Sequence, residues 1–220
     1  MPVEITWLGH SCFRLRDRAA TVVTDPYGKD IGLNLARVRA DIVTVSHDAD
    51  DHNYVKCVKG DFQVLNGPGE YEVSSVFVTG LELRGDRKAK KETAAQRNTV
   101  FLFEFDDLTI CHLGDLNLVP TQAQVEEALG EVDVLLIPVG GGETLNASQA
   151  AEVVSLLEPH VVIPMHYHVP ECTLKLDTVS RFLKEMGLDK VPPQESLKVS
   201  RSGLPDESQI MLLELKSKEE

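Results

Sequence analysis

The sequence predicts an α/β protein built as a four-layer αββα sandwich, in which two sheets pack face to face and helices lie outside them. Short strand signals dominate the first half of the chain, and strands alternate with amphipathic helices in the second half. No Pro-, Gly- or Ser-rich linker separates the two halves, and 220 residues can share one core. We therefore expect a single domain over residues 1–220.

Alternating and apolar segments predict the strands of the first half. Val3, Ile5 and Trp7 alternate with polar residues, as in a strand with one buried face. The run from Ile42 to Val45 is apolar or β-branched throughout, as in a strand buried on both faces. The predicted elements are strands at 3–7, 12–15, 21–24, 42–45, 62–65, 71–73 and 76–79, and a short helix at 54–59.

Capping signals divide the second half into strands and helices. Thr121 and Asn146 are predicted N-caps, and Gly130 and Gly187 are predicted to end helices because glycine readily adopts the left-handed conformation. Residues 84–97 are polar and basic without an apolar period, so we expect a solvated loop rather than an anion-binding lid. The predicted elements are strands at 101–105, 108–113, 133–139 and 161–165, helices at 121–129, 147–157 and 176–186, and edge strands near the carboxyl end.

Composition indicates a globular protein and argues against two classes of partner. The hydrophobic content of 42% and the charged content of 26% are ordinary. A net charge of −13 argues against a nucleic-acid coat or a binder of anionic membranes, since both need a basic face. No apolar run is long enough for a membrane span, and the first residues do not resemble a signal peptide. Four scattered cysteines without C-x-x-C spacing indicate reduced thiols and a cytoplasmic protein.

A cluster of metal-capable side chains follows the predicted strand at 42–45. An unpaired charge loses its hydration in a packed core, so a buried structural role does not explain such a cluster, although an acidic solvated turn would. Asp25, Asp115 and His166 follow other predicted strands, and rigid strand ends can bring distant ligands together. Imidazole and carboxylate suit zinc, iron or manganese, so the joint pattern favours a metal site. The cluster after the strand consists of His47, Asp48, Asp50, Asp51 and His52.

Six short motifs occur in order along the chain, over Val3 to about Leu215. They are Trp7-Leu8-Gly9-His10, Thr24-Asp25-Pro26, Ser46-His47 with Asp51-His52, Pro68-Gly69-Glu70-Tyr71, Cys111-His112-Leu113-Gly114-Asp115 and Ile163-Pro164-Met165-His166-Tyr167. Together they resemble the metallo-β-lactamase superfamily, and most closely its ascorbate-lactonase-like branch of zinc-dependent hydrolases. The resemblance implies the αββα sandwich and, usually, two metals bridged by a hydroxide.

The chain departs from the family pattern at the first of the two metal positions. The family's H-x-H-x-D-H loop has Ala49 here in place of its second histidine. A third histidine is expected near residues 83–86, where this chain has Arg84 and Gly85. His47 is then the only imidazole left at that position, and one imidazole cannot hold a divalent ion against water. Whether Asp48 or Asp50 rebuilds this position stays open.

The second metal position is intact by the same resemblance. Its implied ligands are Asp51, His52 and His166, with Asp115 as the carboxylate that normally bridges. Asp25 would orient the histidine loop through hydrogen bonds. We therefore expect one divalent metal, with zinc as the first candidate and manganese or iron as alternatives.

These residues suggest a hydrolase that acts on a small-molecule ester, lactone or phosphodiester through a water activated by one metal. Asp115 or His47 would serve as the protein base, and His10 would contact substrate from the first hairpin turn. His112 is expected to be structural, because on an extended strand it would point away from Asp115.

Two other function classes stay open. The loss of histidine at Ala49 and Gly85 suggests a non-catalytic member that binds a metal or ligand. The basic residues between 84 and 97 suggest nucleic-acid processing, which the acidic net charge argues against. A second copy of the chain also stays open as a partner.

Overall fold

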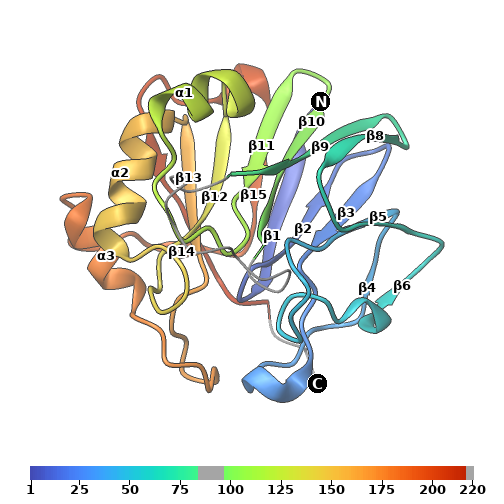
Figure 1. Ribbon diagram of the computed structural model, residues 1–220, viewed down its shortest axis with the longest axis horizontal. Coiled ribbons are helices and arrows are strands. Elements are labelled where there is room, and N and C mark those ends of the chain that lie inside the picture. Colours follow the sequence, from blue (N-terminus) through green and yellow to red (C-terminus); the bar gives the residue numbers. More distant parts are fainter. Residues whose placement is uncertain (84–96, 217–220) are drawn as a thin grey trace.

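The computed structural model describes residues 1–83 and 97–216, and two β-sheets form its centre (Figure 1). Two short strand pairs lie outside them, β4 (Val38–Arg39) with β6 (Val58–Lys59) and β14 (Pro193–Gln194) with β17 (Leu212–Leu213). The six-stranded sheet has the order β15 (Leu197–Val199), β1 (Val3–Gly9), β2 (Cys12–Arg16), β3 (Thr21–Thr24), β5 (Ile42–Thr44) and β7 (Gln63–Leu65). The seven-stranded sheet has the order β16 (Gln209–Ile210), β13 (Val161–Met165), β12 (Val134–Pro138), β11 (Leu108–His112), β10 (Thr99–Phe105), β9 (Val76–Glu82) and β8 (Gly69–Val73).

Each sheet changes from antiparallel to parallel pairing beside the strands that lead into the predicted site. The pairs β1–β2 and β2–β3 are antiparallel, whereas β3–β5 and β5–β7 are parallel. In the second sheet β10–β11 is antiparallel, and β11–β12 and β12–β13 are parallel. Parallel neighbours end at the same edge of a sheet, so the residues that follow β3 and β5 come together, as do those that follow β11 and β13.

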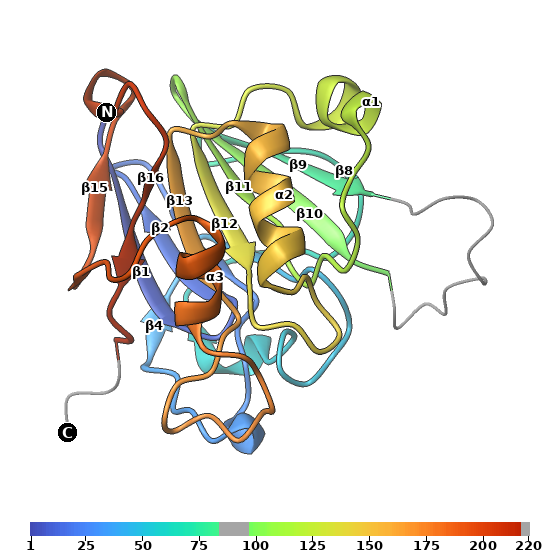
Figure 2. The same ribbon diagram turned by 90° about the vertical axis from the view of Figure 1, so that its left-hand side faces the viewer.

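The helices lie outside the seven-stranded sheet (Figure 2). They are α1 (Gln122–Gln124), which continues as a π-helical turn over Val125–Leu129, α2 (Ala147–Leu157) and α3 (Val179–Glu185). Both predicted N-caps are confirmed: the Thr121 and Asn146 side chains accept hydrogen bonds from the backbone of Gln124 and Gln149, in capping boxes. Among the described helices, none combines the length and the apolarity that crossing a bilayer requires.

Apolar side chains fill both faces of the six-stranded sheet, as the sequence of the strand at 42–45 predicts. Ile42 packs into the large core between the sheets, together with Val3 and Phe101. Val43 points the other way, into a smaller cluster with Tyr27 and other residues. The alternation of β5 therefore buries the strand from two sides and holds the loop that follows it on a rigid base.

One predicted element is wrong, and one segment lies outside the described residues. The expected helix at 54–59 is a single 3-10 turn at Val55–Cys57 followed by β6. The turn is short because Val58 and Lys59 form β6, whose backbone pairs in parallel with β4 and so cannot continue a helix. The face of the six-stranded sheet that carries the smaller cluster is therefore covered by short 3-10 turns and loops. The predicted basic loop lies almost wholly in residues 84–96, as does the position of the family's third histidine.

Candidate metal centre

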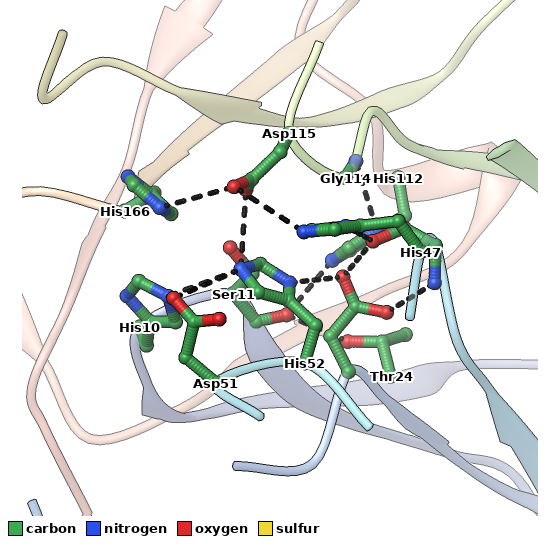
Figure 3. Close-up of polar contacts among 12 residues, drawn as sticks. His10, Ser11, Thr24, His47, Asp51, His52, His112, Gly114, Asp115 and His166 are labelled. Carbon is green, nitrogen blue, oxygen red and sulfur yellow. Dashed lines mark hydrogen bonds and ion pairs between the residues drawn. The ribbon is translucent and has the colours of Figure 1, made fainter. Parts of the chain in front are cut away.

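Side chains from both sheets meet at one edge of the sandwich (Figure 3). His10 lies in the turn between β1 and β2, and Asp25 follows β3. The loop 47–52 follows β5, Asp115 follows β11 after a short turn, and His166 follows β13 directly. The predicted rule, that polar residues at strand ends converge, describes this arrangement.

Three of these residues have strained backbone conformations. The φ angles of His10, Asp25 and His166 are 53°, 37° and 52°, in the left-handed region that residues with a Cβ rarely adopt. Such a conformation costs on the order of 1–3 kcal/mol and persists where the surroundings impose it, often at functional sites. Here the His166 N–H donates to the His10 carbonyl at 3.2 Å and the Trp7 indole donates to the same oxygen at 2.9 Å. The bond from His166 ties the two sheets together at the site, and the bond from Trp7 holds the turn that carries His10.

Three of the four side chains predicted as ligands meet at Asp115, and the fourth, Asp51, lies beside His10 and His52. The Oδ1 atom of Asp115 lies 3.3 Å from His52 Nε2, and its Oδ2 atom lies 3.4 Å from His166 Nε2. Asp51 Oδ2 is 3.8 Å from His52 Nε2. Burial alone would raise the pKa of Asp115, but His166 and His52 outweigh it and hold that pKa well below its usual range. The carboxylate is therefore ionised and available to a cation.

His10 lies inside the same cluster and is deeply buried. Its side chain is 1% exposed, and its Nε2 atom lies 3.1 Å from His52 Nε2 and 3.3 Å from Asp51 Oδ2. Its ring centroid is 4.2 Å from that of His166. Burial, with the nearby His166, lowers the pKa of His10 to about 4. The ring is therefore neutral near pH 7, which is the form that ligates metals.

Asp25 orients His52 through a hydrogen bond. Its fully buried carboxylate accepts from the Ser46 N–H at 2.8 Å, from the Ser46 hydroxyl at 2.6 Å and from His52 Nδ1 at 2.9 Å. With its Nδ1 proton given to Asp25, His52 turns Nε2 toward Asp115 and the centre of the cluster. Burial opposes ionisation of Asp25, yet the hydrogen bond from His52 outweighs it and the pKa of Asp25 is lowered. This is the arrangement that orients histidine ligands in metal sites.

His47 lies at the other side of the cluster, and its acidic neighbours do not. His47 Nε2 is 3.9 Å from Asp115 Oδ2, and burial lowers the pKa of His47. Asp48 is exposed and its Oδ1 accepts from the Asn53 side chain at 2.8 Å, and Asp50 is exposed as well. Within the described part of the chain, the groups able to hold an ion are His10, His52 and His166, and His47, His52 and Asp115. Neither Asp48 nor Asp50 belongs to these groups.

Asn98 holds the Asp115 turn, and no pattern in the sequence pointed to it. Its Oδ1 atom accepts from the Asp115 N–H at 2.8 Å, and its Nδ2 group donates to the Leu113 carbonyl at 2.8 Å. Gly114, between them, has φ 55°, and a Cβ there would lie 2.3 Å from Asn98 Oδ1 and 2.5 Å from Ser46 Cβ. Glycine is thus required for the turn that presents Asp115.

His112 joins the turns that carry His10 and Asp115. Its Nε2 donates to the Ser11 carbonyl at 2.8 Å, and its Nδ1 accepts from the Gly114 N–H at 3.2 Å. β11 ends at His112, so the ring points between the sheets while the chain turns before Asp115. Both ring nitrogens are used in this way, which agrees with the structural role predicted for His112.

The donor atoms of this cluster fit a divalent transition metal. Asp115 Oδ1 is buried and accepts no hydrogen bond within the described residues. Burial would lower the pKa of His52, but Asp115 and Asp25 outweigh it and raise that pKa well above its ordinary value. The carboxylates of Asp115 and Asp25 therefore stabilise positive charge at this position, and a divalent metal ion would supply such charge. Imidazole and carboxylate are the ligands of zinc, manganese and iron in proteins.

Comparison with known proteins gives a consistent family. A family model described as "Beta-lactamase superfamily domain" matches residues 4–166. A UPF0173 protein of Pyrococcus furiosus is 30% identical over 75% of this chain and 83% of its own length. A UPF0173 metal-dependent hydrolase of Pyrococcus horikoshii is 25% identical over 76% of this chain and 85% of its own. A solved structure from Thermotoga maritima, assigned to the zinc-dependent hydrolases of the metallo-beta-lactamase superfamily, is 39% identical, with a TM-score of 0.77, and the match covers 96% of this chain and 98% of that one.

Proposed function

This chain belongs to the beta-lactamase superfamily and to its metal-dependent hydrolases, and we propose that it cleaves an ester, lactone or phosphodiester bond in a small molecule with one divalent metal. Zinc is the first candidate, with manganese or iron as alternatives. Asp51, His52, Asp115 and His166 would hold the ion. When bound, such an ion lowers the pKa of a coordinated water and polarises a substrate oxygen.

The observation that carries this proposal is the convergence on Asp115. His52 Nε2 and His166 Nε2 lie 3.3 and 3.4 Å from its two carboxylate oxygens, although the three residues come from different strands. Two ligands that share one zinc ion are separated by about 3.4 Å at the tetrahedral angle, for bonds of about 2.1 Å. The spacing of the donor atoms therefore supports one shared ion.

His47 is the better of the two candidate bases. Asp115 is a poor proton acceptor, because neighbouring imidazoles hold its pKa well below the usual range. His47 is neutral at pH 7, since burial lowers its pKa, and its side chain keeps 12% exposure, more than the other imidazoles of the cluster. A neutral, partly exposed imidazole 3.9 Å from Asp115 Oδ2 can take a proton from an attacking water at the centre and pass it to solvent.

Turnover of a substrate panel tests the proposal. Protein loaded with zinc, manganese or iron is assayed against a lactone, a phosphodiester and a thioester, together with Asp51→Ala and Asp48→Ala. The control residue Asp48 is an exposed acid of the same loop that lies outside the cluster. We expect turnover of at least one ester-class substrate, a large loss in Asp51→Ala and near-normal rates in Asp48→Ala. No turnover with any metal, or equal rates in both variants, would refute hydrolysis at this site.

A further inference from the structure

We propose that His10 is itself a metal ligand, so that the single ion lies on the His10 side of His52 and not on the His47 side. The inference rests on the metal site proposed above, but not on hydrolysis. It gives the first hairpin turn a role in holding the ion, where the sequence suggested only a contact with substrate.

His52 can serve only one of the two candidate groups of ligands. Its Nδ1 donates to Asp25 at 2.9 Å, which leaves Nε2 as its only atom for an ion. Yet this atom belongs both to the group with His10 and His166 and to the group with His47 and Asp115. Among the described residues no candidate group contains both His10 and His47, so we take one ion on Nε2 to add either His10 or His47 to the ligands His166 and Asp115.

Spacing favours the side of His10. Its Nε2 lies 3.1 Å from His52 Nε2 and 3.3 Å from Asp51 Oδ2. Ligands about 2.1 Å from one zinc ion are separated by about 3.0 Å at a right angle and about 3.4 Å at the tetrahedral angle. On the other side, Asp115 Oδ1 is also 3.3 Å from His52 Nε2, but His47 Nε2 lies farther from its neighbour, at 3.9 Å from Asp115 Oδ2.

Burial favours the same side. His10, His52 and His166 are all buried, whereas His47 is partly exposed, and attraction between a cation and its ligands is stronger where water is excluded. His10 Nε2 makes its polar contacts inside the cluster, with His52 Nε2 and Asp51 Oδ2. An ion on the His52 Nε2 lone pair would face any proton on His10 Nε2 at close range. With the ring proton of His10 on Nδ1, the Nε2 lone pair would face the same space as that of His52.

Metal affinity in matched variants tests this placement. Chelator-stripped full-length protein is titrated with Zn²⁺ against a chromophoric chelator, using the wild type, His10→Asn, His47→Asn and His166→Asn. Asparagine tolerates the left-handed backbone of His10 and His166 better than most residues. Loss of an outer hydrogen-bond partner of a metal ligand weakens binding by about 10–100-fold, so loss of a ligand should exceed about 100-fold. We expect that loss in His10→Asn and His166→Asn, and less than about tenfold in His47→Asn.

The outcomes separate this inference from the site itself. A large loss in His166→Asn with none in His10→Asn would overturn the His10 assignment and leave the metal site standing. X-ray absorption of the zinc-loaded wild type gives a second measurement that needs no variant. Three imidazoles on the ion, one fewer in His10→Asn and an unchanged number in His47→Asn, support the inference. Two imidazoles in the wild type, or a loss only in His47→Asn, contradict it.

Discussion

Replacing Asp25 with asparagine should weaken metal binding although Asp25 is not among the proposed ligands. The carboxylate accepts three hydrogen bonds, two from Ser46 and one from His52 Nδ1. Asparagine is nearly isosteric and tolerates the φ of 37° at this position, but it offers only one acceptor oxygen. Its NH₂ group must therefore face a donor, either the Ser46 N–H or the His52 Nδ1–H.

The second arrangement changes the tautomer of His52. With an amide NH₂ beside it, Nδ1 becomes an acceptor and the ring proton moves to Nε2, the atom 3.3 Å from Asp115 that the ion needs. The first arrangement leaves a buried backbone N–H without a partner, which costs about 1–3 kcal/mol of stability. We expect Asp25→Asn to lower the free energy of unfolding by roughly that amount and the zinc affinity by about 10–100-fold.

Urea unfolding of metal-free protein and a competitive zinc titration measure the two effects. Asp133→Asn is the matched control, because Asp133 is 1% exposed, accepts from the Thr109 N–H at 2.8 Å and pairs with Arg201 far from the cluster. The control should lose stability and keep its zinc affinity. If Asp25→Asn binds zinc as tightly as the wild type does, the orientation of His52 by Asp25 does not matter and the reasoning is wrong.

Three further predictions concern the turn before Asp115, pH and the thiols. Gly114→Ala should destabilise the protein and weaken zinc binding, because a Cβ would lie 2.3 Å from Asn98 Oδ1; urea unfolding and zinc titration that match the wild type would exclude this clash. Asp115 and Asp25 raise the pKa of His52, so below that pKa a metal ion must displace a proton from the ring. Zinc affinity should therefore rise with pH by about tenfold per unit for one proton. Calorimetry in buffers of different ionisation enthalpy counts the released protons, and a count of zero would contradict this prediction. Burial raises the pKa of Cys12 and Cys111, so both thiols should resist a thiol reagent in the native protein and react only after unfolding; fast native modification of either, located by mass spectrometry, would show that the core is open there.

Local patterns were enough to predict the strands and the edge of the sheets where the site lies. The apolar run at 42–45 indicated a strand buried on both faces, and the structure confirms it with Ile42 and Val43 in different clusters. Polar residues at the ends of buried strands pointed to Asp115 and His166, whose side chains do meet. These predictions succeed because alternation and burial within one strand are local properties of the chain.

Features that depend on contacts between distant segments could not be predicted in this way. The turn at 55–57 looked helical, but pairing of β6 with β4 decides its conformation. Asn98 follows a polar segment and resembles any loop residue until Thr99 N–H binds the Ser46 carbonyl and brings the side chain to Asp115. The inward position of His10 likewise depends on contacts across the sheets, including the bond from the His166 N–H to the His10 carbonyl.

Anomalous diffraction at the zinc edge, from crystals of the zinc-loaded protein, tests the metal site most directly. We predict one strong peak per chain, with His52 Nε2, His166 Nε2 and an Asp115 oxygen each about 2.0–2.2 Å from it. Two peaks of similar height would mean that the first metal position works without the histidine replaced by Ala49. A peak elsewhere, or none, would mean that these strand ends do not hold the ion.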